Sequence, residues 1–371
     1  MTQLIYKTFM VFVLTGLVST SYADYRKDFT KTIKEEFDIS SDGKVDLSNQ
    51  FGKLEINTWT KNSVKIAVTI IARTNTESQA QEIFDRIDID FVNEKDFVKA
   101  TTDIQSSRSS WWGGWSNNNA DFAINYEVFV PNTVELDIQN RHGDTYITEM
   151  SNDAHLNIKH GSITADGFSG DLNFEMAHGS GTIVTAKSIR SNISQSNIRF
   201  KKVGNVQLES AHCNIAVEDA ENIKLEARHS NLDLGNIGEL RVDSRHSKFE
   251  IDQVQSIFSE SAHSVYEVEK VDKNIDFDFT HGGATIELLQ KGFEEVSLSG
   301  THASFKIGVD PNAAFDLDVY GTHAGIRFPS DLDISYEKDK SHTREVKGAK
   351  KGSGKKGLIK ARLTHGGLRI R

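Results

Sequence analysis

From residue 142 onwards, the chain alternates apolar and polar residues in short stretches that return at a nearly fixed interval. Each copy has a histidine followed, three and five residues later, by apolar residues, as in HCNIAV from His212 and HSNLDL from His229. A second apolar pair with the same period of two precedes the histidine, for example Ile223 and Leu225. Alternation of this kind is typical of strands that bury one face. Each repeat is therefore predicted to hold two or three short strands joined by corners.

The histidine occupies the most regular position of the repeat. The marker positions are His142, His160, His178, Gln195, His212, His229, His246, His263, His281, His302, His323 and His365. They are separated by 18, 18, 17, 17, 17, 17, 17, 18, 21, 21 and 42 residues, and 11 of the chain's 13 histidines occupy them. An interval near 17 is too short for a strand, a crossover helix and loops, but it fits one coil of a parallel β-helix.

We therefore predict an all-β solenoid of about a dozen coils of 17–21 residues over residues 132–371, with an insertion at 337–357. The chain ends inside a coil at Arg371 with no evident cap, so end-to-end self-association is a possible consequence. Cys213 is the only cysteine and cannot form an intrachain disulfide, so stability must come from the strands and the core.

Residues 1–23 have the pattern of a secretory signal peptide: Lys7, an apolar run, and the small-x-small sequence that ends at Ala23. No other apolar run approaches 18 residues, so we expect no transmembrane segment. These features predict an exported protein that is periplasmic, held at the cell surface or secreted. The formal net charge of −10 argues against nucleic acid as a partner.

Residues 24–131 are less regular and are predicted to form an α+β cap over the N-terminal end of the solenoid. The predicted elements are strands over 63–72, 88–92 and 122–130 and a short helix over 76–87. The helix has a possible capping box from Thr76 to Gln79. LSNQFGKLEI (47–56) is similar to IQNRHGDTYI (138–147), so the first coil is expected here, with Phe51 at the marker position.

These corners, the signal sequence and the segment INYEVFVP before the repeats resemble a known family over roughly residues 44–371. It is the putative-adhesin family of β-strand-repeat proteins, a family of unknown function from bacterial envelopes. The resemblance implies a right-handed β-helix and an exported or envelope location, and it provides no catalytic residues. This chain departs from the family pattern because it has histidine at nearly every marker.

The histidine column is the first candidate site. Each marker shares its strand parity with buried positions two and four residues earlier, so the rings are expected to point inward or along the corner. Neutral, stacked imidazoles in a hydrogen-bonded ladder are the favoured interpretation, with stability lost as the pH falls below about 6.5. Metal binding by His212, His229, His246 and His263 is the alternative, although a straight column does not make a tetrahedron.

Acidic residues form a second column three positions before the marker. Its members are Glu209, Glu226, Asp243, Glu260 and Asp278. They are expected to face solvent, where Lys224, Arg228, Arg241 and Arg245 could pair with them in weak surface ion pairs. A face that binds divalent cations or carbohydrate is the alternative, because oxygen ligands suit calcium.

Two loops carry further candidate contacts. Trp111, Trp112 and Trp115 lie among glycines and asparagines, either folded back onto the cap or exposed as a platform for a glycan, a lipid surface or a protein. The insertion at 337–357 contains KGAKKGSGKKG, either a solvated loop that discourages edge association or a contact for anionic lipid or polysaccharide.

No nucleophile elbow, phosphate loop or metalloprotease helix occurs, and no cofactor is implied. The favoured function is a non-enzymatic exported scaffold or adhesin-like protein that binds an envelope or extracellular polymer or protein. A polysaccharide-acting β-helix enzyme is the alternative from another class, although tight coils leave little room for a cleft. A metal-binding solenoid is the third possibility.

Overall fold

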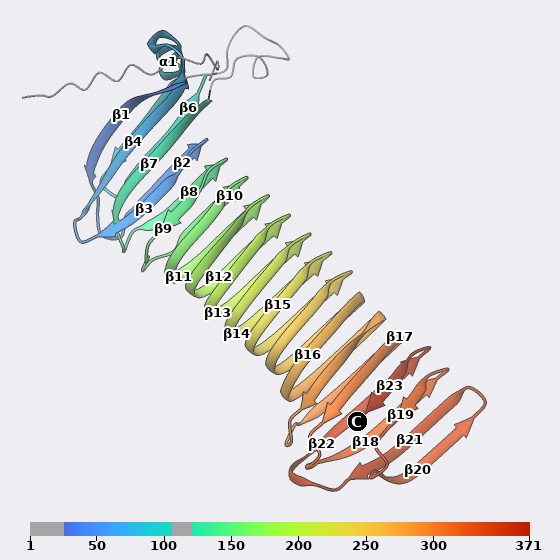
Figure 1. Cartoon of the computed structure of the whole chain (residues 1–371). Coiled ribbons are helices and arrows are strands. Elements are labelled where there is room, and N and C mark those ends of the chain that lie inside the picture. The colour runs from blue at the N-terminus through green and yellow to red at the C-terminus, as the bar shows by residue number, and fades with distance from the viewer. Residues whose placement is uncertain (1–25, 106–120) are drawn as a thin grey trace, which may run out of the picture.

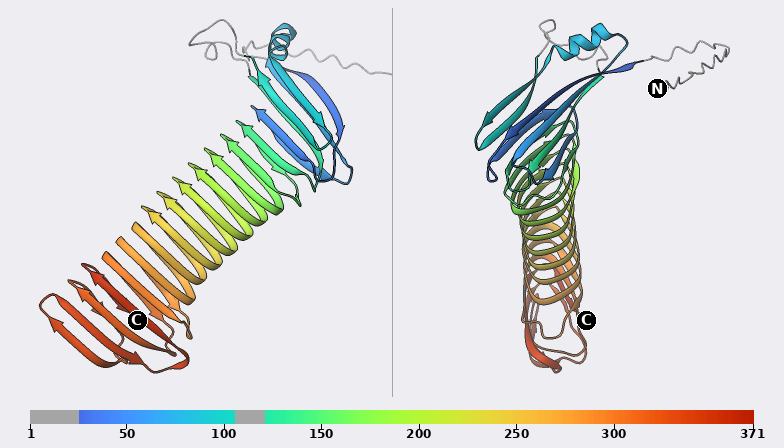
Figure 2. Two further views of the ribbon diagram at one scale, coloured as in Figure 1. Left: turned by 180° about the vertical axis from the view of Figure 1, so that it is seen from behind. Right: turned by 90° about the vertical axis from the view of Figure 1, so that its left-hand side faces the viewer.

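Alternating apolar and polar residues produce strands that pair side by side along almost the whole chain. The computed structural model describes residues 26–105 and 121–371. In this part of the chain, 23 strands form one long sheet with mostly parallel order, and one helix accompanies them. Figure 1 shows the strands stacked along a single axis, and Figure 2 shows from two other sides that each repeat bends back on itself.

The regular part of the stack comprises ten strands. They are β8 (Glu135–Arg141), β9 (Thr145–Ile147), β10 (Ala154–Lys159), β11 (Ser162–Ala177), β12 (Ser180–Ser194), β13 (Asn197–Ala211), β14 (Asn214–Arg228), β15 (Asn231–Arg245), β16 (Lys248–Leu289) and β17 (Glu295–Val309). Neighbours pair in parallel with the offset of the repeat, so that Ile215 of β14 lies beside Leu232 of β15 and Glu226 lies beside Asp243. This register agrees with the predicted period of 17.

Each long strand contributes two arms to one core. In β14, Ile215 and Val217 on the first arm and Ile223 and Leu225 on the second are at most 2% exposed, while the residues between them face outward. Ala220 is also buried where the strand bends between the arms. Burial of a side chain of this size stabilises a fold by about 1.5–3 kcal/mol. Because each coil repeats the same pattern, the core continues through the whole stack.

The N-terminal end begins with a coil formed by β2 (Lys44–Gln50) and β3 (Leu54–Trp59). These strands pair in parallel with β8 and β9 on one side and with β6 and β7 on the other. The Phe51 ring stacks on the His142 ring with 5.0 Å between centroids, so Phe51 occupies the first marker position, as predicted.

Antiparallel pairing then closes this end of the stack. The remaining elements are β1 (Lys27–Asp38), β4 (Ser63–Thr74), α1 (Glu77–Phe84), β5 (Ile87–Glu94), β6 (Phe97–Ile104) and β7 (Asp121–Pro131). Strand β4 lies between β1 and β7, and β5 pairs with β6. The Thr76 side chain accepts a hydrogen bond from the Gln79 amide at 3.3 Å, as expected for the N-cap of this helix.

The C-terminal strands do not stack in chain order. They are β18 (Ala313–Thr322), β19 (Gly325–Arg327), β20 (Asp333–Lys340), β21 (Thr343–Lys350), β22 (Ser353–Thr364) and β23 (Gly367–Ile370). The coil of β22 and β23 is inserted between β17 and the coil of β18 and β19. The expectation that the chain stops in an uncovered last coil is therefore wrong.

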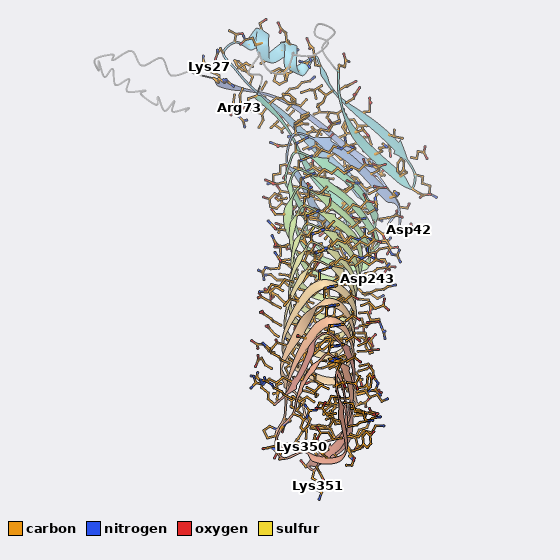
Figure 3. All side chains as sticks on the ribbon, turned by 90° about the vertical axis from the view of Figure 1, so that its right-hand side faces the viewer. Lys27, Asp42, Arg73, Asp243, Lys350 and Lys351 are labelled. Atoms are coloured by element: carbon orange, nitrogen blue, oxygen red, sulfur yellow. The ribbon has the colours of Figure 1, made fainter. Side chains whose placement is uncertain are left out.

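A β-hairpin covers this end instead. Strand β21 pairs antiparallel with β18, and β20 pairs antiparallel with β21. The segment 337–357 was expected to be a loop, but it forms parts of β20, β21 and β22. The outer strand β20 ends in the charged run Glu337–Lys340, which opposes pairing with another sheet edge. Figure 3 shows Lys350 and Lys351 at this end of the stack.

Candidate functional site

The markers form one column along the stack, made of stacked rings except at Gln195, which we name the histidine ridge. Its order is Phe51, His142, His160, His178, Gln195, His212, His229, His246, His263, His281, His302, His365, His323 and His342. Neighbouring rings from Phe51 to His178 and from His212 to His323 lie 4.8–5.0 Å apart, with planes within 8°. His342 from the terminal hairpin adds a last ring that was not predicted, 4.5 Å from His323.

The rings of the ridge lie at the corners and point outward, so of the two expected orientations, inward or along the corner, the inward one is wrong. Every marker has a positive φ, from 48° at Gln195 to 60° at Phe51, whereas neighbouring strand residues are extended. A left-handed residue interrupts the alternation of a strand, so the marker and the residue before it both face outward and the next residue faces inward. In the sequence Arg228-His229-Ser230, for example, the first two side chains are exposed and the third is 1% exposed.

Small residues follow the markers and form a column behind the ridge, which we name the small-residue column. Its members are Gly143, Gly161, Gly179, Ser196, Cys213, Ser230, Ser247, Ser264, Gly282, Ala303, Ala324 and Gly366. A Cβ on Gly161 would lie 2.0 Å from the carbonyl oxygen of Gly143, so the corners are too close for a side chain at this position. Where serine replaces glycine, its hydroxyl accepts a backbone N–H of the preceding coil. Ser230 accepts from Cys213 at 3.2 Å.

Proton binding to the ridge is opposed by its own geometry. Two imidazolium charges 4.8 Å apart repel by about 0.9 kcal/mol in bulk water and about 3.5 kcal/mol at an effective dielectric of 20. The pKa of His160 is lowered by desolvation within the stack, then by His142 and His178 and by Lys159. A lowered folded-state pKa means that the unfolded chain binds the proton more tightly. Stability is therefore complete above about pH 6.5 and declines as the pH falls below it.

The ridge does not present a ready metal site. Two zinc–nitrogen bonds of about 2.0–2.1 Å require nitrogens at most about 4.2 Å apart, whereas His212, His229, His246 and His263 are stacked with centroids 4.8–5.0 Å apart and rings nearly parallel. In residues 26–105 and 121–371, no group of three or more His, Cys, Asp or Glu side chains is arranged to hold a metal ion. The Cys213 thiol is buried and hydrogen-bonds to the carbonyls of Ile193 and Ala211, and burial raises its pKa.

The acidic column lies outward and in register along the second arms. Glu209 lies beside Glu226, which lies beside Asp243, which lies beside Glu260. Figure 3 labels Asp243 on the flank of the stack. Within the described residues, no Lys or Arg lies within 4.0 Å of Glu209, Glu226, Asp243, Glu260 or Asp278, so the expected ion pairs with Lys224, Arg228, Arg241 and Arg245 do not form.

Arg241 instead pairs with Glu239 at 2.7 Å and lies over the Phe258 ring. The acidic carboxylates therefore keep their charge exposed, beside like charges on the next coils. Like charges directly opposite each other on neighbouring strands are destabilising.

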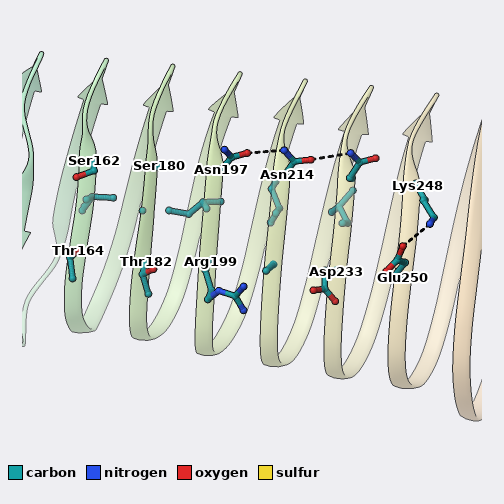
Figure 4. Close-up of a pocket in the computed structure, with 17 residues that line it drawn as sticks. Ser162, Thr164, Ser180, Thr182, Asn197, Arg199, Asn214, Asp233, Lys248 and Glu250 are labelled. Atoms are coloured by element: carbon teal, nitrogen blue, oxygen red, sulfur yellow. Dashed lines mark hydrogen bonds and ion pairs between the residues drawn. The ribbon is translucent and has the colours of Figure 1, made fainter.

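A groove crosses the first arms of six successive strands, from β11 to β16, and has a volume of about 590 Å³ (Figure 4). Its walls are two rows of outward side chains, two and four residues after the markers. The first row is Ser162, Ser180, Asn197, Asn214, Asn231 and Lys248, and the second is Thr164, Thr182, Arg199, Ala216, Asp233 and Glu250. Sequence reasoning missed this site, although the asparagines after successive markers were a visible signal.

The asparagines of the groove form a ladder of side-chain amides. The Asn214 amide donates to the Asn197 oxygen at 2.8 Å, and the Asn231 amide donates to the Asn214 oxygen at 2.9 Å. Each amide carries two donor hydrogens and two acceptor lone pairs, so each retains hydrogen-bonding capacity toward a ligand. The charged residues are mostly paired: Lys248 with Glu250 at 2.6 Å, and Arg199 with Glu218 at 3.3 Å.

A second, smaller groove of about 310 Å³ lies on the opposite arms of β11 to β15. Asn222 donates to Asn205 there at 2.8 Å. Its outward row includes Arg190, Lys224 and Arg241, so this groove is more basic than the first.

The two loop candidates have different outcomes. Trp111, Trp112 and Trp115 lie outside the described residues. The lysines of the C-terminal insertion are exposed or partly exposed, and three of them form ion pairs: Lys350 with Asp331, Lys355 with Glu294, and Lys356 with Asp316. These ion pairs leave less free positive charge there than the sequence alone suggested.

Comparison with known proteins gives only distant structural similarity. No protein-family model matches the chain, and none of the curated proteins matches it. A "putative cell adhesion protein" from Clostridium sporogenes is 9% identical with a TM-score of 0.18, over 93% of this chain and 99% of that one.

A "putative lipid binding protein" from Parabacteroides distasonis is 9% identical with a TM-score of 0.21, over 92% and 96% of the two chains. A "putative adhesin" from Bacteroides fragilis is 11% identical with a TM-score of 0.24, over 92% and 97%. In the described part of the chain, no helix combines the length and hydropathy needed to cross a bilayer.

Proposed function

We propose that this chain is a non-enzymatic binding scaffold of the bacterial envelope that holds an extended, uncharged glycan in the groove on β11 to β16. The proposal takes the stack as a right-handed parallel β-helix that is exported by its N-terminal signal. The observation that carries it is a groove that crosses six coils and has a short polar side chain, serine or asparagine, in its first row on five of them.

The shape of the groove favours a linear ligand. Its walls repeat with the strand spacing of about 4.8 Å, so they offer regularly spaced contacts over about 24 Å of the stack axis. A small molecule would use one or two of these repeats, whereas a polymer along the axis would use all of them.

The chemistry of the groove favours hydroxyl and amide groups over charge. The amide ladder from Asn197 to Asn231 and the hydroxyls of Thr164 and Thr182 both donate and accept hydrogen bonds. Lys248 pairs with Glu250 and Arg199 pairs with Glu218, so Asp233 is the one charged groove residue with no ion pair among the described residues. Sugar hydroxyls and acetamido groups can pair with these donors and acceptors.

One observation supports hydrolysis of a glycan as a second candidate function. Asp233 and Glu250 are outward neighbours in register on β15 and β16. Retaining glycosidases place two carboxyl groups about 5–5.5 Å apart. Glu250 is already paired with Lys248, however, and both carboxylates are exposed, whereas a general acid requires a carboxyl with a raised pKa.

The test is the binding of neutral oligosaccharides from a glucan, a mannan and chitin, measured by isothermal titration calorimetry with the full chain. Ala216→Trp should fill the groove and weaken binding at least about tenfold. Gln207→Trp, an outward substitution on the opposite arm of the adjacent coil, is the matched control and should bind normally. Equal binding by both variants, or no binding by the parent chain, would refute the proposal.

Release of shorter products from a bound glycan would favour hydrolysis, provided that Glu250→Gln abolishes the release and preserves binding. Thermal melts of each variant show whether it is folded.

A further inference from the structure

We propose that the histidine ridge is an acid-activated binding surface for a linear polyanion, which lies along the stack axis and contacts successive imidazolium groups. This surface is distinct from the groove on β11 to β16. Its proposed ligand is negatively charged, whereas the ligand proposed for the groove is uncharged. Its uninterrupted part runs from His212 to His342 and contains nine histidines.

The fold itself does not require imidazole at the markers. Glycine and asparagine adopt a positive φ most readily, and the ridge also accepts Gln195 with a φ of 48°. Phe51 shows that a ring that cannot be protonated stacks equally well. Histidine is nevertheless used at 11 of the 12 markers from His142 to His365, with the ring exposed. Proton binding at mildly acidic pH is the property that distinguishes it.

The charges nearest the ridge are mainly basic. The residues directly before the markers include Arg141, Lys159, Arg228 and Arg245, all outward. The charged residues two positions after the markers are Lys53, Asp144 and Lys248. The acidic column lies one outward position further away. Besides the five members of the acidic column, the row three residues before the markers holds two more charged residues, Glu175 and Arg362. Near the terminal hairpin, Lys340 and Arg344 flank Ser341 and His342.

This arrangement predicts that the charge which an anion meets at the ridge changes from negative to positive as the pH falls. At neutral pH, the exposed acidic column and the net charge of −10 repel an anion. Protonation of all 13 histidines would change the formal net charge from −10 to +3, and 12 of these positive charges would lie in one line. The polymer's negative charges would reduce the repulsion between neighbouring imidazolium groups, so binding and proton uptake are linked.

A linear polymer fits the ridge better than a small anion or a metal ion. Each coil presents the same ring in the same orientation, so no coil provides a special concave site. A small anion would contact two rings at most. A metal ion cannot join two parallel rings at this separation unless the side chains rotate.

The probe is dextran sulfate, whose charge does not change over this pH range, with dextran as its uncharged counterpart. Binding to the full chain is measured by calorimetry at about pH 7.5 and about pH 5.5, on either side of the usual histidine pKa. We expect affinity for dextran sulfate to rise at least about tenfold at the lower pH, with proton uptake seen as a dependence on buffer ionisation enthalpy. Dextran should show no such rise.

The decisive variant is His229→Asn/His246→Asn/His263→Asn, because asparagine accepts the positive φ and cannot be protonated. This triple variant should lose most of the rise in affinity for dextran sulfate at the lower pH. His155→Asn, which removes a histidine outside the ridge, should keep the full gain. Gln195→His, which joins the two runs of rings, should increase it.

An equal gain in the triple variant, or no gain in the parent chain, would overturn the proposal. Binding that requires added zinc and is abolished by a chelator would overturn it in favour of a metal site. Thermal melts at both pH values show whether each variant is folded.

Discussion

The histidine ridge and the small-residue column are one residue apart in the chain, yet they obey different constraints. The small-residue column is buried or partly buried, and only glycine, serine, alanine or cysteine occurs there. The ridge is exposed or partly exposed, and its positions accept histidine, phenylalanine and glutamine. Available space and backbone hydrogen bonds therefore explain the first column, whereas neither explains why the second is almost entirely histidine.

The two columns therefore show that a residue type can recur in every coil for two different reasons, packing or proton chemistry. A residue that recurs because packing allows nothing larger should cost stability when it is changed. A residue that recurs because of its proton chemistry should cost little stability, but it should change how the surface responds to pH.

The largest loss of stability is expected for Gly161→Val, which breaks the small-residue column. Its Cβ would lie 2.0 Å from the Gly143 carbonyl oxygen, so two corners must move apart. We expect the free energy of unfolding to fall by about 3 kcal/mol or more in urea titrations. Gly325→Val is the matched control, since nothing lies within 4 Å of a Cβ there. A similar loss in both variants would show that close approach of the corners is not the cause.

Ser230→Ala tests the hydroxyls of the same column. It leaves the Cys213 amide without its acceptor in a buried corner, and we expect a loss of about 1–2 kcal/mol in the free energy of unfolding. Ser304→Ala, at an exposed strand position, should have almost no effect. An unchanged midpoint for Ser230→Ala would mean that water or a rearranged backbone satisfies the amide.

His246→Asn tests the ridge, where the effect on stability should be smaller. The substitution removes two ring contacts, with His229 and His263, and should cost less than about 1 kcal/mol at neutral pH in urea titrations. His246→Phe should retain the stack and the stability. A loss as large as that of Gly161→Val would show that the imidazole is a structural requirement.

The smallest effect is expected for Asp243→Asn in the acidic column. Removing one charge between Glu226 and Glu260 should raise the free energy of unfolding by a few tenths of a kcal/mol at low salt. Asp243→Glu, which keeps the charge, should not. A rise in the melting temperature of the parent chain with calcium, lost in Asp243→Asn, would instead indicate a cation site.

Much of the fold could be predicted from the sequence because the repeat is almost exact. The alternation of apolar residues gives the register of β13 to β16, and the similarity of 47–56 to 138–147 gives the place of Phe51. The predicted cap strands over 63–72, 88–92 and 122–130 correspond to β4, β5 and β7.

The remaining features depend on backbone geometry and long-range pairing. Strand parity predicted inward rings, but one left-handed residue per corner reverses the side. Chain order placed His323 next to His302, whereas His365 lies between them because the last coil is inserted into the stack. The groove appears only when the short side chains of six coils, such as Thr182 and Ala216, lie side by side.

The most direct test of the account is a histidine titration followed by NMR, using the imidazole Hε1 and Cε1 resonances from about pH 8 to about pH 4.5. The group to follow is His160, whose ring is stacked between those of His142 and His178. His160 should be protonated at lower pH than usual, since its pKa is lowered. Protonation of His160 at the usual pH for a histidine would contradict the account.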